Sequence, residues 1–289
     1  MNWFIVVAII SPFVWGLMNI LDKYVVSHKV KNPLSFAVVA GMVNLAFGII
    51  VSFFADWSTI GIKDIFYPAL AGALFGGQFF LYYWMISKED VSNIIGFVYF
   101  YPVVVAFLSF LILHETLSLL SYVGVCVIIL GILLLSIRMR KLDFKVAIWM
   151  VIVMILVAAS YEFLIKMSTT VISEVQGLAI SLLSVGSVIM LGWLHPGIRK
   201  GVRHEFKNLK WAVLVESMTF LAVLTAYFGM AGMSATIFSS IAATQPVAVL
   251  LFEKLFHILG INVCRDESFL PKLVPIGIIV VGVILLYIS

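Results

Sequence analysis

Charged side chains are scarce in this sequence: Lys, Arg, Asp and Glu together make up 11% of its 289 residues. Hydrophobic residues make up 63%, and the mean hydropathy is +1.18. A water-soluble domain of this length needs much more polar surface to stay in solution. The shortage of charge therefore excludes a soluble fold and indicates a chain that crosses a membrane several times.

Alternation of polar and apolar residues, the pattern of membrane β-barrel strands, is also missing. The chain instead contains continuous apolar runs of about 20 residues, the length of a membrane-spanning helix. Hydrocarbon offers backbone amides no hydrogen-bonding partners, so runs of this kind must satisfy their own backbone as helices. The sequence predicts an all-α membrane protein.

Motifs of enzymes and metal sites are absent as well. The chain has no Walker loop, no Gly-x-Ser-x-Gly elbow and no Cys-x-x-Cys pair, and its two cysteines, Cys126 and Cys264, fall at different depths. His114 and Glu115 share a short loop without a second histidine at metal-ligand spacing. We therefore expect no metal, no cofactor and no enzymatic activity. Uphill transport by such a chain would need an ion gradient or solute exchange.

Ten apolar stretches run along the chain, separated by short segments with Pro, Gly and clustered charges. Each is about 20 residues long, which is enough to cross a membrane as a helix. The predicted spans are residues 3–26, 34–55, 65–86, 92–113, 118–137, 145–167, 176–194, 211–231, 236–258 and 272–288.

The basic residues gather in the odd-numbered loops between these spans. The two richest loops contain Arg138, Arg140, Lys141 and Lys145, and Arg199, Lys200, Arg203, Lys207 and Lys210. Because cytoplasmic loops carry an excess of Lys and Arg, we expect a multi-pass cell-membrane protein with both termini outside. The net charge of +4 then reflects these loops and does not indicate a nucleic-acid partner.

The two halves of the sequence resemble each other when one is shifted by about 143 residues. The segment "WGLMNILDK" (15–23) aligns with "AASYEFLIK" (158–166), and "FVYFYPVVVAFLS" (97–109) aligns with "IAATQPVAVLLFE" (241–253). The aligned pairs include Asn19 with Glu162, Lys23 with Lys166, and Pro102 with Pro246.

Such a repeat has a consequence for topology. Each half contains five predicted spans, and five is odd, so the halves must enter the membrane from opposite sides. We predict ten transmembrane helices arranged as two inverted five-helix repeats, 1–137 and 146–289, joined by a basic cytoplasmic linker, 138–145.

Two tracts also carry a family resemblance: "WGLMNILDK" from Trp15, and "YPVVVAFLSFLILHETLS" followed by "YVGVCVIILGILLLS" from Tyr101. Their Trp-Gly opening, Pro, Glu and paired Gly resemble the EamA-type repeat of the drug/metabolite transporter superfamily. The second half departs from it, with Ala158 and Ala159 in place of Trp-Gly. The resemblance implies a ten-helix fold, a central cavity between the halves and alternating-access movement of small metabolites, often amino acids and frequently as export.

Glu162 and Lys166 interrupt the sixth predicted span, where charges are costly unless they are paired or face water. Glu followed by Lys at i+4 is the favourable order for a helical ion pair, so Lys166 could simply anchor Glu162 near the surface. Alternatively, Glu162 could face the cavity and bind a proton or the solute. Lys23 likewise could be a snorkelling anchor or a site for an anionic group.

Glu253 and Glu216 are two further carboxyls inside predicted spans. Glu253 follows Pro246 by two turns in the ninth span and is a second candidate for proton coupling. Glu216 could contact Lys254, and all three charged residues could equally belong to the membrane rim.

Aromatic and neutral polar side chains could line a cavity between the repeats. The substrate-binding candidates are Trp15, Asn19, Gln78, Tyr82, Tyr99, Tyr101, Tyr161, Glu162, Thr244 and Gln245. Pro102 and Pro246 are hinge candidates, because proline frees a carbonyl one turn earlier and permits a kink, although proline is also tolerated in membrane helices without such a role. Gly72 and Gly76 have the Gly-x-x-x-Gly spacing that predicts close helix packing.

The sequence therefore predicts a secondary active transporter that moves a small organic metabolite, amino-acid-like or similar, by alternating access, with proton-coupled export as one form. Its partners would be a small-molecule solute and membrane lipids, and it would be a monomer or homodimer. The alternative is a membrane-embedded enzyme acting on a lipid-linked substrate, which would need clustered carboxylates or histidines at one membrane face. A channel would need pore-lining rings, usually from oligomers.

Overall fold

The computed structural model describes residues 3–88, 91, 94, 98, 100–138, 148–261, 263 and 273–288, and these form helices joined by turns, without a strand. The first half contains α1 (Trp3–His28), α2 (Pro33–Ser52), η1 (Trp57–Thr59), α3 (Phe66–Lys88), α5 (Tyr101–Leu108), η2 (Ser109–Leu113) and α6 (Leu119–Arg138). The second half contains α7 (Ile148–Thr169), α8 (Glu174–Met190), η3 (Leu191–Leu194), α9 (Pro196–Glu205), η4 (Phe206–Asn208), α10 (Leu209–Ala231), α11 (Ala235–Ala242), α12 (Gln245–Ile258) and α13 (Leu273–Ile288).

The helices are apolar over lengths that suit a bilayer. Among the described residues, seven helical segments are long and apolar enough to cross a membrane. Three shorter apolar helices accompany them, at Tyr101–Leu113, Leu119–Leu134 and Val274–Leu285. The predictions of an all-α fold and of a multi-pass membrane protein are confirmed.

Helix α9 lies in a segment that the sequence analysis treated as a loop. Pro196 occupies its first turn, where a missing N–H group costs no helical hydrogen bond. Val202 and Glu205 are buried, and Glu205 Oε1 accepts the backbone N–H groups of Lys31 and Asn32 at 3.0 Å each. A carboxylate from the second half thus satisfies the free amides at the beginning of α2, in the first half.

The ninth predicted span, 236–258, is two helices and not one kinked helix. Helix α11 ends at Ala242, and α12 begins at Gln245 with Pro246 in its first turn. The break follows from proline, which donates no hydrogen bond and clashes with the carbonyl of residue i−4. Helix α5 likewise begins with Pro102 in its first turn. Whether either proline acts as a hinge stays a prediction.

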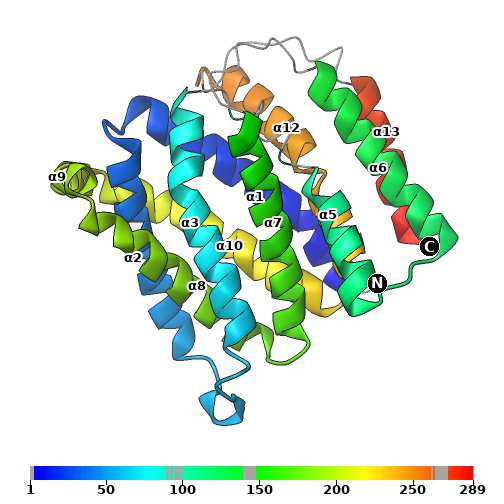
Figure 1. Ribbon diagram of the computed structural model, residues 1–289. Coiled ribbons are helices and arrows are strands. Elements are labelled where there is room, and N and C mark those ends of the chain that lie inside the picture. Colours follow the sequence, from blue (N-terminus) through cyan, green and yellow to red (C-terminus); the bar gives the residue numbers. More distant parts are fainter. Residues whose placement is uncertain are drawn as a thin grey trace.

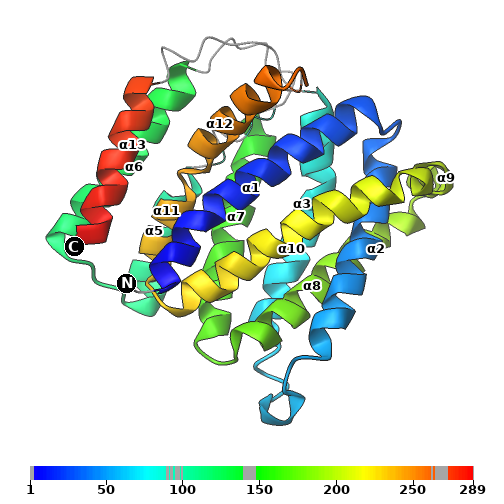
Figure 2. The same cartoon turned by 180° about the vertical axis from the view of Figure 1, so that it is seen from behind.

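Helices of the two halves pack against each other throughout the bundle (Figure 1 and, from behind, Figure 2). Helix α2 lies against α8, and α6 lies against α13 at one edge of the molecule. The other contacts between the halves come in pairs, in which each helix of one contact is replaced by its predicted counterpart from the other half. The contact of α1 with α10 corresponds to that of α7 with α3. The contact of α1 with α12 corresponds to that of α7 with α5, and the contact of α3 with α8 corresponds to that of α10 with α2. Nearly every helix therefore depends on the other half for its buried face.

Glycines allow the closest of these approaches. A Cβ atom added at Gly131 of α6 would lie 2.6 Å from Ile279 of α13, and one added at Gly282 of α13 would lie 2.6 Å from Ile128 of α6. Each helix thus presents a glycine to an isoleucine of the other. The predicted packing role of Gly76 is also seen, because it faces the backbone of α8.

Gly76 and Gly77 are neighbours in α3 with opposite surroundings. A Cβ atom at Gly76 would lie 2.8 Å from the carbonyl oxygen of Val185, whereas nothing lies within 4 Å of a Cβ atom at Gly77. We expect Gly76→Ala to reduce the free energy of unfolding by about 1–3 kcal/mol through overpacking. Gly77→Ala should raise it by up to about 1 kcal/mol, because alanine favours the helix. Thermal unfolding of the detergent-purified protein measures both, and equal shifts would contradict the expectation.

Candidate functional site

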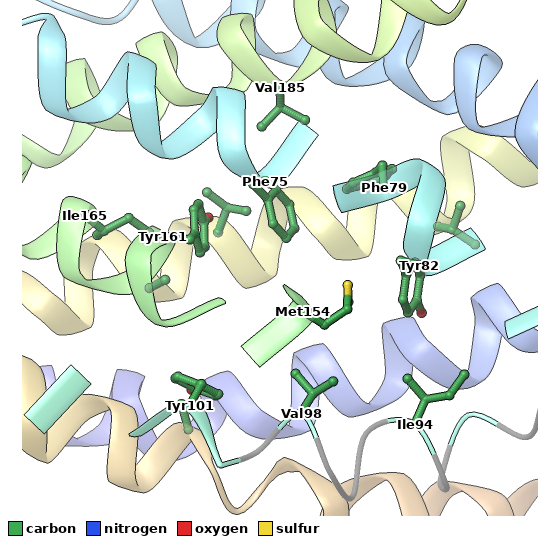
Figure 3. Packing of buried hydrophobic residues seen from close by; sticks show 14 of the residues in the cluster. Phe75, Phe79, Tyr82, Ile94, Val98, Tyr101, Met154, Tyr161, Ile165 and Val185 are labelled. Atoms are coloured by element: carbon green, nitrogen blue, oxygen red, sulfur yellow. The ribbon is translucent and has the colours of Figure 1, made fainter. Parts of the chain in front are cut away.

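A cavity of about 100 Å³ lies among α1, α3, α5, α7 and the break between α11 and α12. It is lined by Trp15, Met18, Asn19, Asp22, Phe75, Gln78, Phe79, Tyr82, Val98, Tyr101, Met154, Ala158, Tyr161, Glu162, Ala242 and Gln245. Figure 3 shows lining side chains from α3, α5 and α7 facing one another. The space suits a few water molecules or one small organic molecule.

Most residues proposed from the sequence come together here. Trp15, Asn19, Gln78, Tyr82, Tyr101, Tyr161, Glu162 and Gln245 all line this one cavity. Thr244 does not, because its hydroxyl donates to the Ile241 carbonyl at 2.8 Å. Glu253 is also not among the lining residues, and Tyr99 lies outside the described residues.

Glu162 belongs to the cavity wall on α7. The Tyr101 hydroxyl donates to Oε1 of Glu162 at 2.7 Å, and Oε2 is buried without a hydrogen-bonding partner among the described residues. Lys166, one turn further on, donates instead to the carbonyl oxygens of Met230 and Met233, at 3.0 and 2.7 Å. Of the two alternatives considered for Glu162, the structure therefore places the carboxyl in the cavity wall, and Lys166 bonds to carbonyls where α10 ends.

Lys23 has the same kind of partner in the first half. Its Nζ donates to the carbonyl of Ile86, in the last turn of α3, at 2.8 Å. The side chain is only 8% exposed, so it does not snorkel to the surface. Last-turn carbonyls lack a donor within their own helix, and a lysine of α1 or α7 supplies one in each half.

Comparison with known proteins identifies a family for part of the chain. Residues 2–137 match the model of the EamA-like transporter family. The first half of the chain belongs to this family. The family that the sequence motifs indicated is thereby confirmed.

A solved crystal structure shares the overall fold of this chain. It covers 99% of this chain and 98% of its own, with a TM-score of 0.69 and 13% sequence identity. At that identity the likeness shows the fold alone. No curated protein sequence matches the chain.

Asp22 is a cavity residue that sequence reasoning missed. The Tyr83 hydroxyl donates to Oδ1 of Asp22 at 2.9 Å, and the Tyr82 hydroxyl lies 3.1 Å from Oδ2 and 2.8 Å from Oδ1 of Asn19. Both carboxyl oxygens thus have phenol partners on α3. The available signal was spacing, because Asp22 follows Asn19 by three residues and so lies on the same helix face.

Glu216 is fully buried on α10. The amide of Asn44, on α2, donates to Oε2 of Glu216 at 2.5 Å. A neutral amide from the neighbouring helix therefore provides the partner that a buried carboxyl needs, while Lys254 is exposed on α12.

Pro102 and Pro246 each leave a backbone carbonyl near the cavity without its helical hydrogen bond. Val98 lies four residues before Pro102, and Ala242 lies four residues before Pro246. These are the positions whose carbonyls lose the donor that proline cannot supply, and both line the cavity. Among the described residues, no group of His, Cys, Asp and Glu side chains is placed to hold a metal ion.

Removing the Tyr83 hydroxyl tests the network around Asp22. Tyr83→Phe keeps the ring but leaves Oδ1 of a buried carboxyl without its donor, and we expect a loss of about 1–3 kcal/mol in the free energy of unfolding. Tyr67→Phe is the matched control, because Tyr67 is on the same helix and belongs neither to this network nor to the cavity lining. Thermal unfolding of both variants is the measurement, and equal stability would contradict a role for the hydroxyl.

Proposed function

We propose that this protein is a secondary active transporter that moves a small organic metabolite, amino-acid-like or similar, by alternating access of two inverted five-helix repeats. Proton coupling would act through Glu162, with export as the direction. The observation that carries the proposal is one cavity, lined by side chains from both halves, in which a buried oxygen of Glu162 has no hydrogen-bonding partner among the described residues.

The lining of the cavity supports a repeat. In five of the aligned pairs, both residues line the cavity. These pairs are Trp15 with Ala158, Met18 with Tyr161, Asn19 with Glu162, Val98 with Ala242, and Tyr101 with Gln245. A site on the axis that relates two halves receives equivalent positions from each, as in inverted-repeat transporters. The exchanged helix contacts and the two lysine–carbonyl bonds support the same relation.

Ten spans and the proposed topology are compatible with the helices. The seven long apolar segments and three shorter apolar helices together make ten. The marked chain ends lie toward the same end of the bundle (Figures 1 and 2), which is compatible with an even number of spans. We place both ends outside and the basic loops, including α9, in the cytoplasm.

Contacts at the two ends of the bundle suggest how access could alternate. At the proposed cytoplasmic end, Glu205 holds the backbone of Lys31 and Asn32. At the other end, Glu115 Oε1 accepts the backbone N–H of Ala235, the first residue of α11, at 3.0 Å. Each contact joins the two halves, so opening one end while keeping the other closed would make the cavity accessible from alternate sides.

The surface suits lipid contact. Large apolar side chains are exposed on the outer helices, among them Phe107, Phe110, Leu130, Trp149 and Ile284. We propose membrane lipids as the surrounding partners of a monomer or homodimer, with the cell membrane as its location.

Replacing Glu162 tests the coupling step. Solutes that stabilise the purified protein are identified by thermal shift, and their uptake into proteoliposomes is measured across an imposed pH gradient. We expect Glu162→Gln to reduce proton-driven flux at least about tenfold, the factor for 1.4 kcal/mol, and to remove its pH dependence. The reason is that an amide cannot take up or release a proton in this pH range.

Two further variants sharpen that experiment. Glu174→Gln, the same change in the first turn of α8, should transport like the unaltered protein. Glu253→Gln tests the other coupling candidate and should keep the pH profile, since Glu253 is not part of the cavity lining. Unchanged flux and pH profile in Glu162→Gln would contradict the coupling role. Absence of flux for every stabilising solute would contradict transport itself.

A further inference from the structure

The cavity contains acidic side chains and, among the residues that the structure describes, no basic one. Asp22 and Glu162 line it from α1 and α7, and no Lys, Arg or His belongs to the lining. The lysines of these two helices are bonded elsewhere, Lys23 to the carbonyl of Ile86 and Lys166 to two carbonyls near the end of α10. No described cationic side chain of the lining therefore compensates the two carboxyls.

The two carboxyls differ in how many of their oxygens have a hydrogen-bonding partner. Both oxygens of Asp22 have phenol partners. Glu162 uses only Oε1, and its buried Oε2 has no partner among the described residues. Oε1 of Gln78, across the cavity on α3, is in the same state. Oε2 of Glu162 and Oε1 of Gln78 are thus buried acceptors without a donor among the described residues. A buried acceptor without a hydrogen bond is energetically unfavourable.

Aromatic rings form much of the remaining wall. The Tyr161 ring stacks on Phe75 with 4.6 Å between centroids, and Trp15 meets Phe75 edge-on at 5.7 Å. The hydroxyls of Tyr82 and Tyr101 already contact acceptors. Aromatic faces attract organic cations, and the attraction grows where water is excluded.

We propose that the solute of this cavity is a small organic amine, whose ammonium group donates to Oε2 of Glu162 and Oε1 of Gln78 while its apolar body lies against the aromatic wall. The inference rests on the proposed transport function and names the substrate class of the same site. Because an ammonium group and a proton would occupy the same carboxylate oxygen, binding of the amine displaces the proton from Glu162. Asp22 and the phenols of Tyr82, Tyr101 and Tyr161 are the other titratable groups of the lining.

A carboxylate on the solute fits this cavity poorly. The lining offers only neutral donors, of which the side-chain amide nitrogen of Asn19 and the hydroxyl of Tyr161 have no partner among the described residues. These suit a hydroxyl or carbonyl group on the solute. An anionic group would instead meet two carboxyls without a cation to offset them. An amine should therefore bind more tightly than the amino acid with the same side chain.

Four probes of matched shape test this on the purified full-length protein: phenethylamine, L-phenylalanine, 3-phenylpropionate and 2-phenylethanol. They carry a cationic, zwitterionic, anionic or neutral polar end on the same phenyl body. We expect phenethylamine to bind about ten- to a hundredfold more tightly than each of the others, the range for a hydrogen bond to a charged group. Calorimetry gives the Kd values, and this comparison needs no variant.

Variants then locate the effect. Glu162→Gln should weaken phenethylamine binding by about ten- to a hundredfold and leave 2-phenylethanol unchanged, whereas Glu174→Gln should change neither. The proposal is overturned if phenethylamine does not bind, if the zwitterion, the anion or the neutral alcohol binds as tightly, or if Glu162→Gln binds the amine normally.

Uptake into proteoliposomes separates this inference from the transport function. Flux of an anionic or neutral solute, without binding of phenethylamine, would overturn the amine assignment and leave the transporter intact. Binding of phenethylamine through Glu162, without flux of any solute that binds, would overturn transport and leave the amine site standing.

Discussion

Hydrocarbon cannot solvate a charged or hydrogen-bonding group, and every polar side chain inside the bundle must find its partner in the protein or in a ligand. Lys23 and Lys166 satisfy carbonyls where α3 and α10 end, and Glu216 accepts from Asn44. These bonds join helices that are far apart in sequence, so they also fix how the helices lie. Glu162 and Glu216 each keep one buried oxygen without a partner among the described residues, and of these two carboxyls only Glu162 lines the cavity.

The same constraint makes the two halves interdependent. Two backbone amides just before α2 are satisfied by Glu205, and the first amide of α11 is satisfied by Glu115. The Gln176 amide similarly donates to the Asp56 carbonyl and the Thr59 hydroxyl, in the loop between α2 and α3. Each of these contacts joins the two halves. A relative movement of the halves would therefore have to break these hydrogen bonds, in addition to separating apolar surfaces.

Much of the cavity could be predicted because polar residues are so rare in this sequence. Asn19, Gln78, Glu162 and Gln245 stand out against apolar spans, and each lines the same cavity. Asp22 was missed although it is one turn from Asn19, and the partner of the buried Glu216 was expected to be Lys254 or none, whereas it is Asn44. Depth along a helix depends on where the span begins, and hydropathy locates that point only to a few residues. Helix α9 was missed because its length and basic residues are those of a loop.

By itself, the sequence determined the class of the protein, its all-helical fold and the family, because these depend on composition and on spacing along the chain. Only the tertiary structure decided that Lys166 bonds to α10 and not to Glu162, that Pro246 separates two helices, and that Asp22 shares the cavity. Those outcomes depend on which carbonyl, hydroxyl or ring another helix brings within about 3 Å, the length of a hydrogen bond. Spacing along one helix cannot specify the distance to another.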